Sequence, residues 1–172
     1  MKRLLLSSVA ALLSVAGLQP AVAQKPDYLT ALEADKIRDA ETTDLRIKLF
    51  LEFAEDRLKK FDYELHRGHR GPRRAERLNA LLNAYVGCVD DAAELIDLGR
   101  EKQEEIRNGI QRMKTKAAEF LAYLKPLLEK GPELESYRAT LEDAILGTED
   151  ALAEARKAEE EYTPPPVRRR PS

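Results

Sequence analysis

Apolar residues recur three and four positions apart over most of the chain, which is the spacing of amphipathic α-helices. One such helix is predicted to begin at the capping residues Thr42 and Asp44 and to end near Gly68 and Pro72. Its apolar stripe consists of Ile47, Phe50, Ala54, Leu58, Phe61 and Leu65. This stripe predicts that one face of the helix is buried against other helices.

A final helix is predicted after the stop signal at Gly131 and Pro132. Its apolar seam repeats in heptads and becomes small in its second half: Leu134, Tyr137, Leu141, Ala144, Thr148, Ala151, Ala155, Ala158 and Tyr162. Small residues allow a second helix to approach closely.

Near the other end of the chain, the letters TALE from Thr30 to Glu33 form a capping box, which predicts a short helix to about Ala40.

The apolar register continues without interruption from Leu78 to Leu127, including across Gly99. The letters after Gly99, REKQEEI, contain neither an N-capping residue nor a proline. These features predict one continuous helix over about residues 72–130, roughly 85 Å long at 1.5 Å per residue. The pattern leaves one alternative open, a turn at Gly99 that would give a four-helix up-down bundle.

The predicted fold class is therefore all-α. We expect an elongated antiparallel helical bundle, or coiled coil, around one long central helix. The helix that begins near Thr42 would pair with the first half of the central helix, and the final helix would pair with the second half. The two pairs would then meet end to end near Gly99.

Residues 1–23 have the pattern of a signal peptide. A short positive segment precedes an apolar run, which ends in an A-x-A cleavage pattern before Gln24. The run is too short to span a bilayer, so we expect no membrane span after cleavage. We predict a periplasmic or secreted protein with a helical domain at 24–162 and a disordered Pro- and Arg-rich tail at 163–172.

Cleavage would remove two of the 29 basic residues and none of the 31 acidic residues, leaving a net charge of −4.

The single cysteine, Cys88, excludes an intrachain disulfide and is predicted to be a small, half-buried core residue. His66 and His69 are too few for a zinc site, and neighbouring arginines would repel a cation. No catalytic, cofactor or metal motif occurs in the sequence, so we expect no enzymatic activity, cofactor or metal.

Five arginines gather around the turn that follows the helix begun near Thr42: Arg67, Arg70, Arg73, Arg74 and Arg77. Several of them fall in the first turns of the next helix, where the helix dipole disfavours cations. An anionic envelope component, such as lipopolysaccharide or a cell-wall phosphate, would explain this placement. Ordinary solvated arginines are the alternative, and export argues against nucleic acid as the partner.

Four further apolar residues lie off the main stripe of the same helix: Leu45, Leu49, Leu51 and Phe53. A helix that is apolar on most sides must be covered on most sides, so these residues predict a protein interface. A second copy of the chain or an apolar client segment would supply the cover. Alternatively, the lead segment with Tyr28 and Leu29 folds back and completes the cover within one chain.

The stretch YLTALEADKIRDAETTDLRIKLFLEFAEDRLKKF, the long helix and LEDAILGTEDAL resemble uncharacterised exported helical proteins of Gram-negative soil bacteria. This resemblance covers most of the mature chain and implies no particular function. The letters LTALE also resemble the LTxxQ motif of small periplasmic helical chaperones of the envelope-stress type, with Glu33 in place of glutamine and no second copy. We therefore expect an exported, non-catalytic interaction or scaffold protein of the cell envelope. A periplasmic chaperone-like protein that binds apolar client segments is the alternative, and an enzyme or metal carrier is the class least favoured.

Overall fold

The computed structural model describes residues 28–67, 71 and 73–162. Within these residues the chain forms helices and turns, without a strand. The elements are α1 (Ala31–Asp39), α2 (Thr43–His66), α3 (Arg74–Glu101), α4 (Arg107–Lys130), the 3-10 helix η1 (Leu134–Ser136) and α5 (Arg138–Glu161). No helix in this part of the chain is long and apolar enough to cross a membrane. The predicted signal peptide and tail lie outside the described residues.

The first two helices begin where their capping residues predict. The hydroxyl of Thr30 accepts a hydrogen bond from the Glu33 amide at 3.3 Å, and the Glu33 carboxylate accepts one from the Thr30 amide at 2.8 Å. Both halves of the capping box at α1 are therefore present. The hydroxyl of Thr42 caps α2 in the same way by accepting a hydrogen bond from the Leu45 amide at 3.2 Å.

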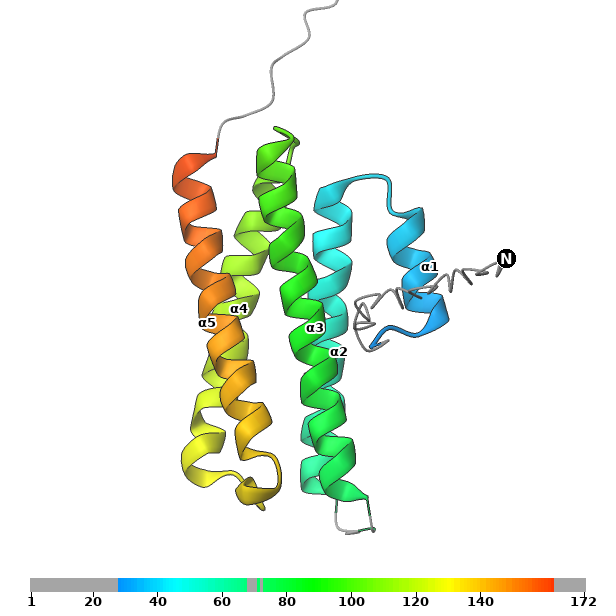
Figure 1. Ribbon diagram of the computed structural model, residues 1–172, viewed down its shortest axis with the longest axis vertical. Coiled ribbons are helices and arrows are strands. Elements are labelled where there is room, and N and C mark those ends of the chain that lie inside the picture. The colour runs from blue at the N-terminus through cyan, green and yellow to red at the C-terminus, as the bar shows by residue number, and fades with distance from the viewer. Residues whose placement is uncertain (1–27, 68–70, 72, 163–172) are drawn as a thin grey trace, which may run out of the picture.

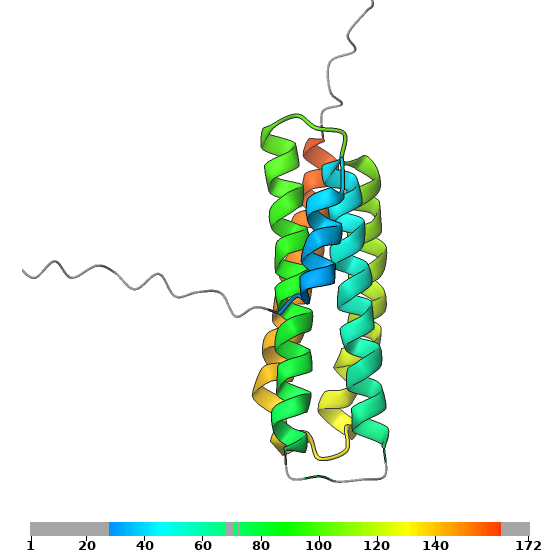
Figure 2. The ribbon, with the colours of Figure 1, turned by 90° about the vertical axis from the view of Figure 1, so that its right-hand side faces the viewer.

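The four long helices form an all-α bundle in which successive helices run in opposite directions (Figure 1). Around the bundle their order is α2, α3, α5, α4. Short turns join the antiparallel pairs α2–α3 and α4–α5, whereas the parallel neighbours α3–α5 and α2–α4 have no direct connection. The link from α3 to α4 therefore crosses the bundle diagonally at one end. The short helix α1 lies outside the bundle, against α2 (Figure 2).

The prediction of one continuous central helix is wrong, and the alternative with a turn describes the molecule. Helix α3 ends at Glu101 because Gln103 adopts a left-handed conformation with φ of 53°. The Glu104 amide donates to the Gly99 carbonyl at 2.8 Å, and the Gln103 amide donates to the Arg100 carbonyl at 3.1 Å. This pair of hydrogen bonds is a Schellman motif, which satisfies the last carbonyls of α3. The two helix pairs therefore lie side by side instead of meeting end to end.

Gly99 contributes to this turn through close packing and not through an unusual backbone angle, since it lies within α3. A Cβ atom at Gly99 would be 2.6 Å from Cγ2 of Ile106, which is far closer than two carbon atoms normally approach. Ile106 is the residue before α4 and is fully buried. The absence of a side chain at Gly99 thus allows the returning chain to bury Ile106.

The core between the helices is apolar and contains a few paired polar groups. The predicted small residues of α5 are buried, which is consistent with close approach of its neighbours: Ala144, Ala151, Ala155 and Ala158. Tyr85 packs edge to face against Phe120, with ring centroids 5.4 Å apart, and its hydroxyl lies 2.6 Å from the Thr148 hydroxyl. Cys88 is fully buried, so it is a core residue as predicted, and more deeply placed than the sequence suggests.

Candidate functional site

The arginines of the α2–α3 turn are largely engaged within the chain. Arg74 is buried and donates hydrogen bonds to the carbonyls of Leu65 at 2.7 Å and Arg67 at 3.1 Å. Its Nε atom also lies 2.9 Å from a carboxylate oxygen of Glu133. Arg74 thus closes the C-terminal end of α2 and ties it to the turn after α4, so it is not a surface contact for an anion.

The other described arginines of this group are Arg67, Arg73 and Arg77. Two of them pair with the buried carboxylate of Glu64: Arg77 at 2.7 Å and Arg67 at 3.2 Å. The two arginines therefore lower the pKa of Glu64, with Arg77 as the larger cause. Arg73 is exposed, and Arg70 lies outside the described residues. Among the described residues, Glu64 at the end of α2 and Glu133 after α4 offset part of the positive charge of this surface.

Of the two histidines, His66 is the one that the structure describes. His66 interacts with Asp62 of the preceding helical turn, with its Nδ1 atom 3.2 Å from the carboxylate. His69 lies outside the described residues. Within the part of the chain that the structure describes, no group of three or more His, Cys, Asp or Glu side chains is arranged to hold a metal ion.

The predicted interface on α2 is mostly covered by the chain itself. Leu51 is only 2% exposed, Phe53 is also buried and Leu49 is partly buried, which leaves only Leu45 of the four residues exposed. Tyr28 and Leu29 pack against the core, as the alternative prediction states. The bundle and its lead segment therefore cover most of this face within one chain, and Leu45 remains exposed.

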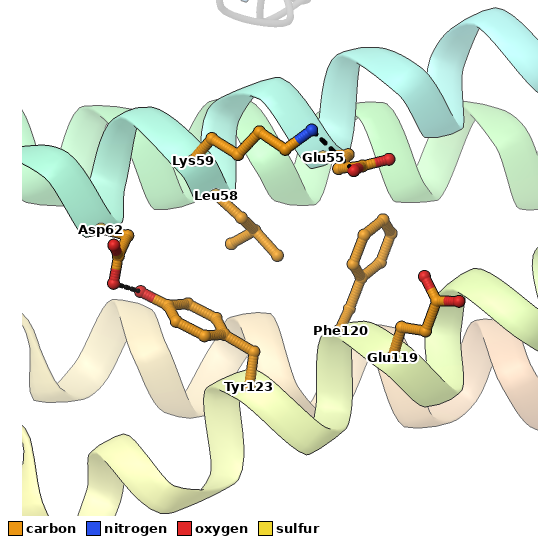
Figure 3. Close-up of a pocket in the computed structure, with 7 residues that line it drawn as sticks. All are labelled: Glu55, Leu58, Lys59, Asp62, Glu119, Phe120 and Tyr123. Atoms are coloured by element: carbon orange, nitrogen blue, oxygen red, sulfur yellow. Dashed lines mark hydrogen bonds and ion pairs between the residues drawn. The ribbon is translucent and has the colours of Figure 1, made fainter.

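The structure instead reveals a groove between the parallel helices α2 and α4. These two helices approach each other at fewer points than the other neighbouring pairs in the bundle. The α2/α4 groove is open to solvent, has a volume of about 300 Å³ and is lined by Glu55, Leu58, Lys59, Asp62, Glu119, Phe120 and Tyr123 (Figure 3). Leu58 and Phe120 form its apolar floor, and the charged residues stand around the rim. A second hollow of about 350 Å³ lies further along the contact between α2 and α4, next to Leu51.

The rim of the groove is a network of paired charges. Lys116 lies between two carboxylates, 3.0 Å from Glu55 and 2.8 Å from Glu119. Glu55 also forms an ion pair with Lys59, whose Nζ atom lies 2.7 Å from the carboxylate. Hydrogen bonds from Lys59 and Lys116 lower the pKa of Glu55, and the bonds to Glu119 and Glu55 raise the pKa of Lys116. Both shifts favour the charged forms at neutral pH.

Tyr123 of α4 lies at one end of the groove and connects α4 to α2. Its hydroxyl donates a hydrogen bond to the Asp62 carboxylate across the groove at 3.0 Å (Figure 3). Burial raises the pKa of Tyr123, and the hydrogen bond to Asp62 raises it further, so the phenol stays neutral at neutral pH. The site therefore offers an apolar floor, carboxylate acceptors and a phenol, which suits it to bind an apolar group next to a hydrogen-bond donor or cation.

No protein-family model matches the chain, and neither a curated protein nor a solved structure shows significant similarity to it.

The sequence pattern places Leu58 in a core stripe and predicts no role for Glu55 or Glu119. The sequence carries no local signal for the groove, because the groove exists only where α2 and α4 are neighbours.

Proposed function

We propose that this chain is an exported, non-catalytic helical binding protein of the cell envelope that engages its partner through the α2/α4 groove. The groove itself is the observation that carries this proposal. Its apolar floor at Leu58 and Phe120 can receive an apolar side chain, and its rim carboxylates can orient a neighbouring donor. A volume of about 300 Å³ suits one or two side chains of a partner segment better than a large cofactor.

The titration behaviour of the groove supports binding over catalysis. A general acid or base works best when its pKa lies near the working pH. The pKa of Glu55 is lowered and the pKa of Tyr123 is raised, so both move away from neutrality. Glu55 and Tyr123 therefore hold fixed protonation states at neutral pH, as expected of residues that recognise a ligand.

The distribution of exposed apolar residues supports a specific partner over a broad range of clients. Among the residues that the structure describes, the large exposed apolar side chains come from four different helices: Leu32, Leu45, Tyr63, Leu98 and Leu146. A chaperone that binds many apolar segments needs an extended apolar surface. The chaperone-like function remains the second candidate, and it would use the same groove.

Export of the chain is part of this proposal and rests on the signal-peptide pattern of residues 1–23. The groove and the export signal are independent features, so each can be tested alone.

A titration followed by methyl NMR tests the groove directly. The probe is a short amphipathic peptide of leucine and lysine, chosen because the groove combines an apolar floor with carboxylates. We expect saturable shifts of the Leu58 methyl signals, with no shift at Leu146, an exposed leucine of α5. Equal shifts at both leucines, or none at Leu58 up to millimolar peptide, would remove the basis for the proposal.

A further inference from the structure

The segment 28–39, which we call the strap, packs on the opposite side of α2 from the groove. It comprises the lead residues 28–30 and the helix α1, which runs alongside α2 (Figure 2). Helix α1 has nine residues, none of them fully buried. An isolated helix of this length is unstable in water, so the strap depends on its contacts with the bundle. This dependence allows the strap to open locally without unfolding of the bundle.

One buried cation provides the main polar attachment of the strap. The Arg57 side chain on α2 is buried, and its guanidinium donates to the Glu33 carboxylate at 2.6 Å and to the Tyr28 carbonyl at 3.2 Å. Burial raises the pKa of Glu33, but the hydrogen bonds from Arg57 and Thr30 outweigh burial and lower it to about 2. Glu33 therefore serves both as the capping carboxylate of α1 and as the partner of Arg57.

Tyr28 provides the second attachment, on α3. Its ring lies directly over Gly87, where a Cβ atom would come within 2.7 Å of the ring. Its hydroxyl donates a hydrogen bond to Asp91, one helical turn further along α3. The strap therefore bridges α2 and α3, and the glycine provides the space for the aromatic ring.

The helical spacing of α2 places two apolar residues on the side that carries Arg57. Arg46 donates to the Ala40 carbonyl at 3.1 Å, so the face of α2 between Arg46 and Arg57 lies towards the strap. Phe50 and Phe53 lie on this face because they are four and seven residues after Arg46. Release of the strap would uncover apolar surface with a single arginine in it, shaped to hold a helix.

We propose that the strap is releasable and that the surface beneath it, formed by Phe50, Phe53, Arg57 and Gly87, is a docking site for an amphipathic helix of a partner protein that carries a carboxylate. The charge of Arg57 determines this chemistry. A buried cation that loses its partner is strongly disfavoured, so a helix that replaces α1 must supply an anion where Glu33 now lies. Asp56 also contacts Arg57 at 2.8 Å, but it is partly exposed and is shared with Lys60.

This inference does not rest on the proposed function of the α2/α4 groove. Arg57 and Glu55 are two positions apart on α2, so they point to nearly opposite sides of the helix. Loss of binding at one site can therefore be measured while the other site stays intact.

The test uses the full mature chain with the substitution Glu33→Gln. Glutamine retains the capping-box hydrogen bonds of α1 but removes the charge that pairs with Arg57. The matched control is Asp35→Asn, which removes the same charge from an exposed residue of α1. We expect Glu33→Gln to speed amide hydrogen exchange across residues 31–40 at least tenfold without affecting α4 and α5, and Asp35→Asn to change it less than twofold.

A second measurement tests docking. A fluorescent peptide with the sequence of residues 28–40 should bind the Glu33→Gln chain at least tenfold more tightly than the wild-type chain, whose own strap competes. The same peptide carrying Glu33→Gln should lose that binding. Unchanged exchange in the Glu33→Gln chain would overturn the releasable strap, and equal peptide binding by both chains, or none by either, would overturn the docking site.

Discussion

Replacing Gly99 by alanine distinguishes the observed turn from a continuous helix. In the interior of an isolated helix, glycine is less stable than alanine by about 1 kcal/mol. A continuous helix through Gly99 would therefore be stabilised by the change. In the bundle, the added Cβ atom would lie 2.6 Å from Cγ2 and 3.2 Å from Cδ1 of the buried Ile106. The two arrangements thus predict opposite signs for the same substitution.

The size of the effect follows from how far Ile106 can move. Its Cγ2 atom is attached to a branched Cβ with a stiff χ1 angle, so the clash cannot be relieved by rotating a flexible chain end. Overpacking of this kind costs typically about 1 to 3 kcal/mol, and we place this contact in the upper half of that range. After subtraction of the gain in helix propensity, we expect Gly99→Ala to lower the free energy of unfolding by about 1 to 2 kcal/mol.

Gly147 in α5 provides the matched control. A Cβ atom there would meet only Asp90, at an ordinary contact distance of 3.8 Å from the carboxylate oxygen. Gly147→Ala should therefore raise the free energy of unfolding by about 0.5 to 1 kcal/mol. Urea unfolding followed by far-ultraviolet circular dichroism measures both variants. If Gly99→Ala stabilises the chain as much as Gly147→Ala does, the packing of Ile106 against Gly99 is refuted.

Three further predictions concern other parts of the molecule. Arg74→Ala should lower the free energy of unfolding by about 3 kcal/mol, because it leaves buried partners unsatisfied, whereas the exposed Arg73→Ala should change it by less than about 0.5 kcal/mol in the same urea experiment. Because the pKa of Glu33 falls from 4.5 to about 2 on docking, attachment of the strap should be fully stabilised above pH 4.5 and weaken as the pH falls towards 2. The loss is about 3 kcal/mol, measurable by NMR of the α1 amides, and it should disappear in Glu33→Gln. Mass spectrometry of the exported protein should find Gln24 at the N-terminus, and an intact leader on membrane-bound protein would contradict export.

The helices that have local signals could be predicted from the sequence. Thr30 and Thr42 cap α1 and α2 where expected, and the apolar stripes identify the buried faces. The turn between α3 and α4 could not be predicted, because its signals are absent from the residues that form it. The left-handed position is Gln103 instead of glycine, and α4 begins after Ile106 without a side-chain cap. Burial of Ile106 in the tertiary structure stabilises a turn that local preferences do not favour.

The continuous apolar register across Gly99 has a physical explanation as well. Ile96 at the end of α3 and Ile110 at the start of α4 are both buried in the same core. Two antiparallel helices that face one core can keep an unbroken spacing of apolar residues through their connecting turn. Spacing alone therefore cannot separate one long helix from two helices with a short link.

The candidate sites were less predictable than the fold, because they depend on which helices become neighbours. The α2/α4 groove joins Asp62 to Tyr123, and Arg74 finds Glu133 across the end of the bundle. Each pair is distant in sequence, and the spacing of charges along a single helix gives no sign of it. The capping role of Glu33 was visible in the sequence, whereas its ion pair with Arg57 was not.

Site-specific photo-crosslinking in producing cells tests most directly whether the α2/α4 groove is the partner-binding surface. A benzophenone amino acid would replace Glu119 at the rim of the groove, and Glu142 on α5 in the control; both side chains are 55% exposed. Glu142 does not line the groove, so the two positions differ in location and not in exposure. We predict discrete crosslinked products from position 119 and none from position 142. Equal crosslinking from both positions, or crosslinking from position 142 alone, would contradict the groove as the binding site.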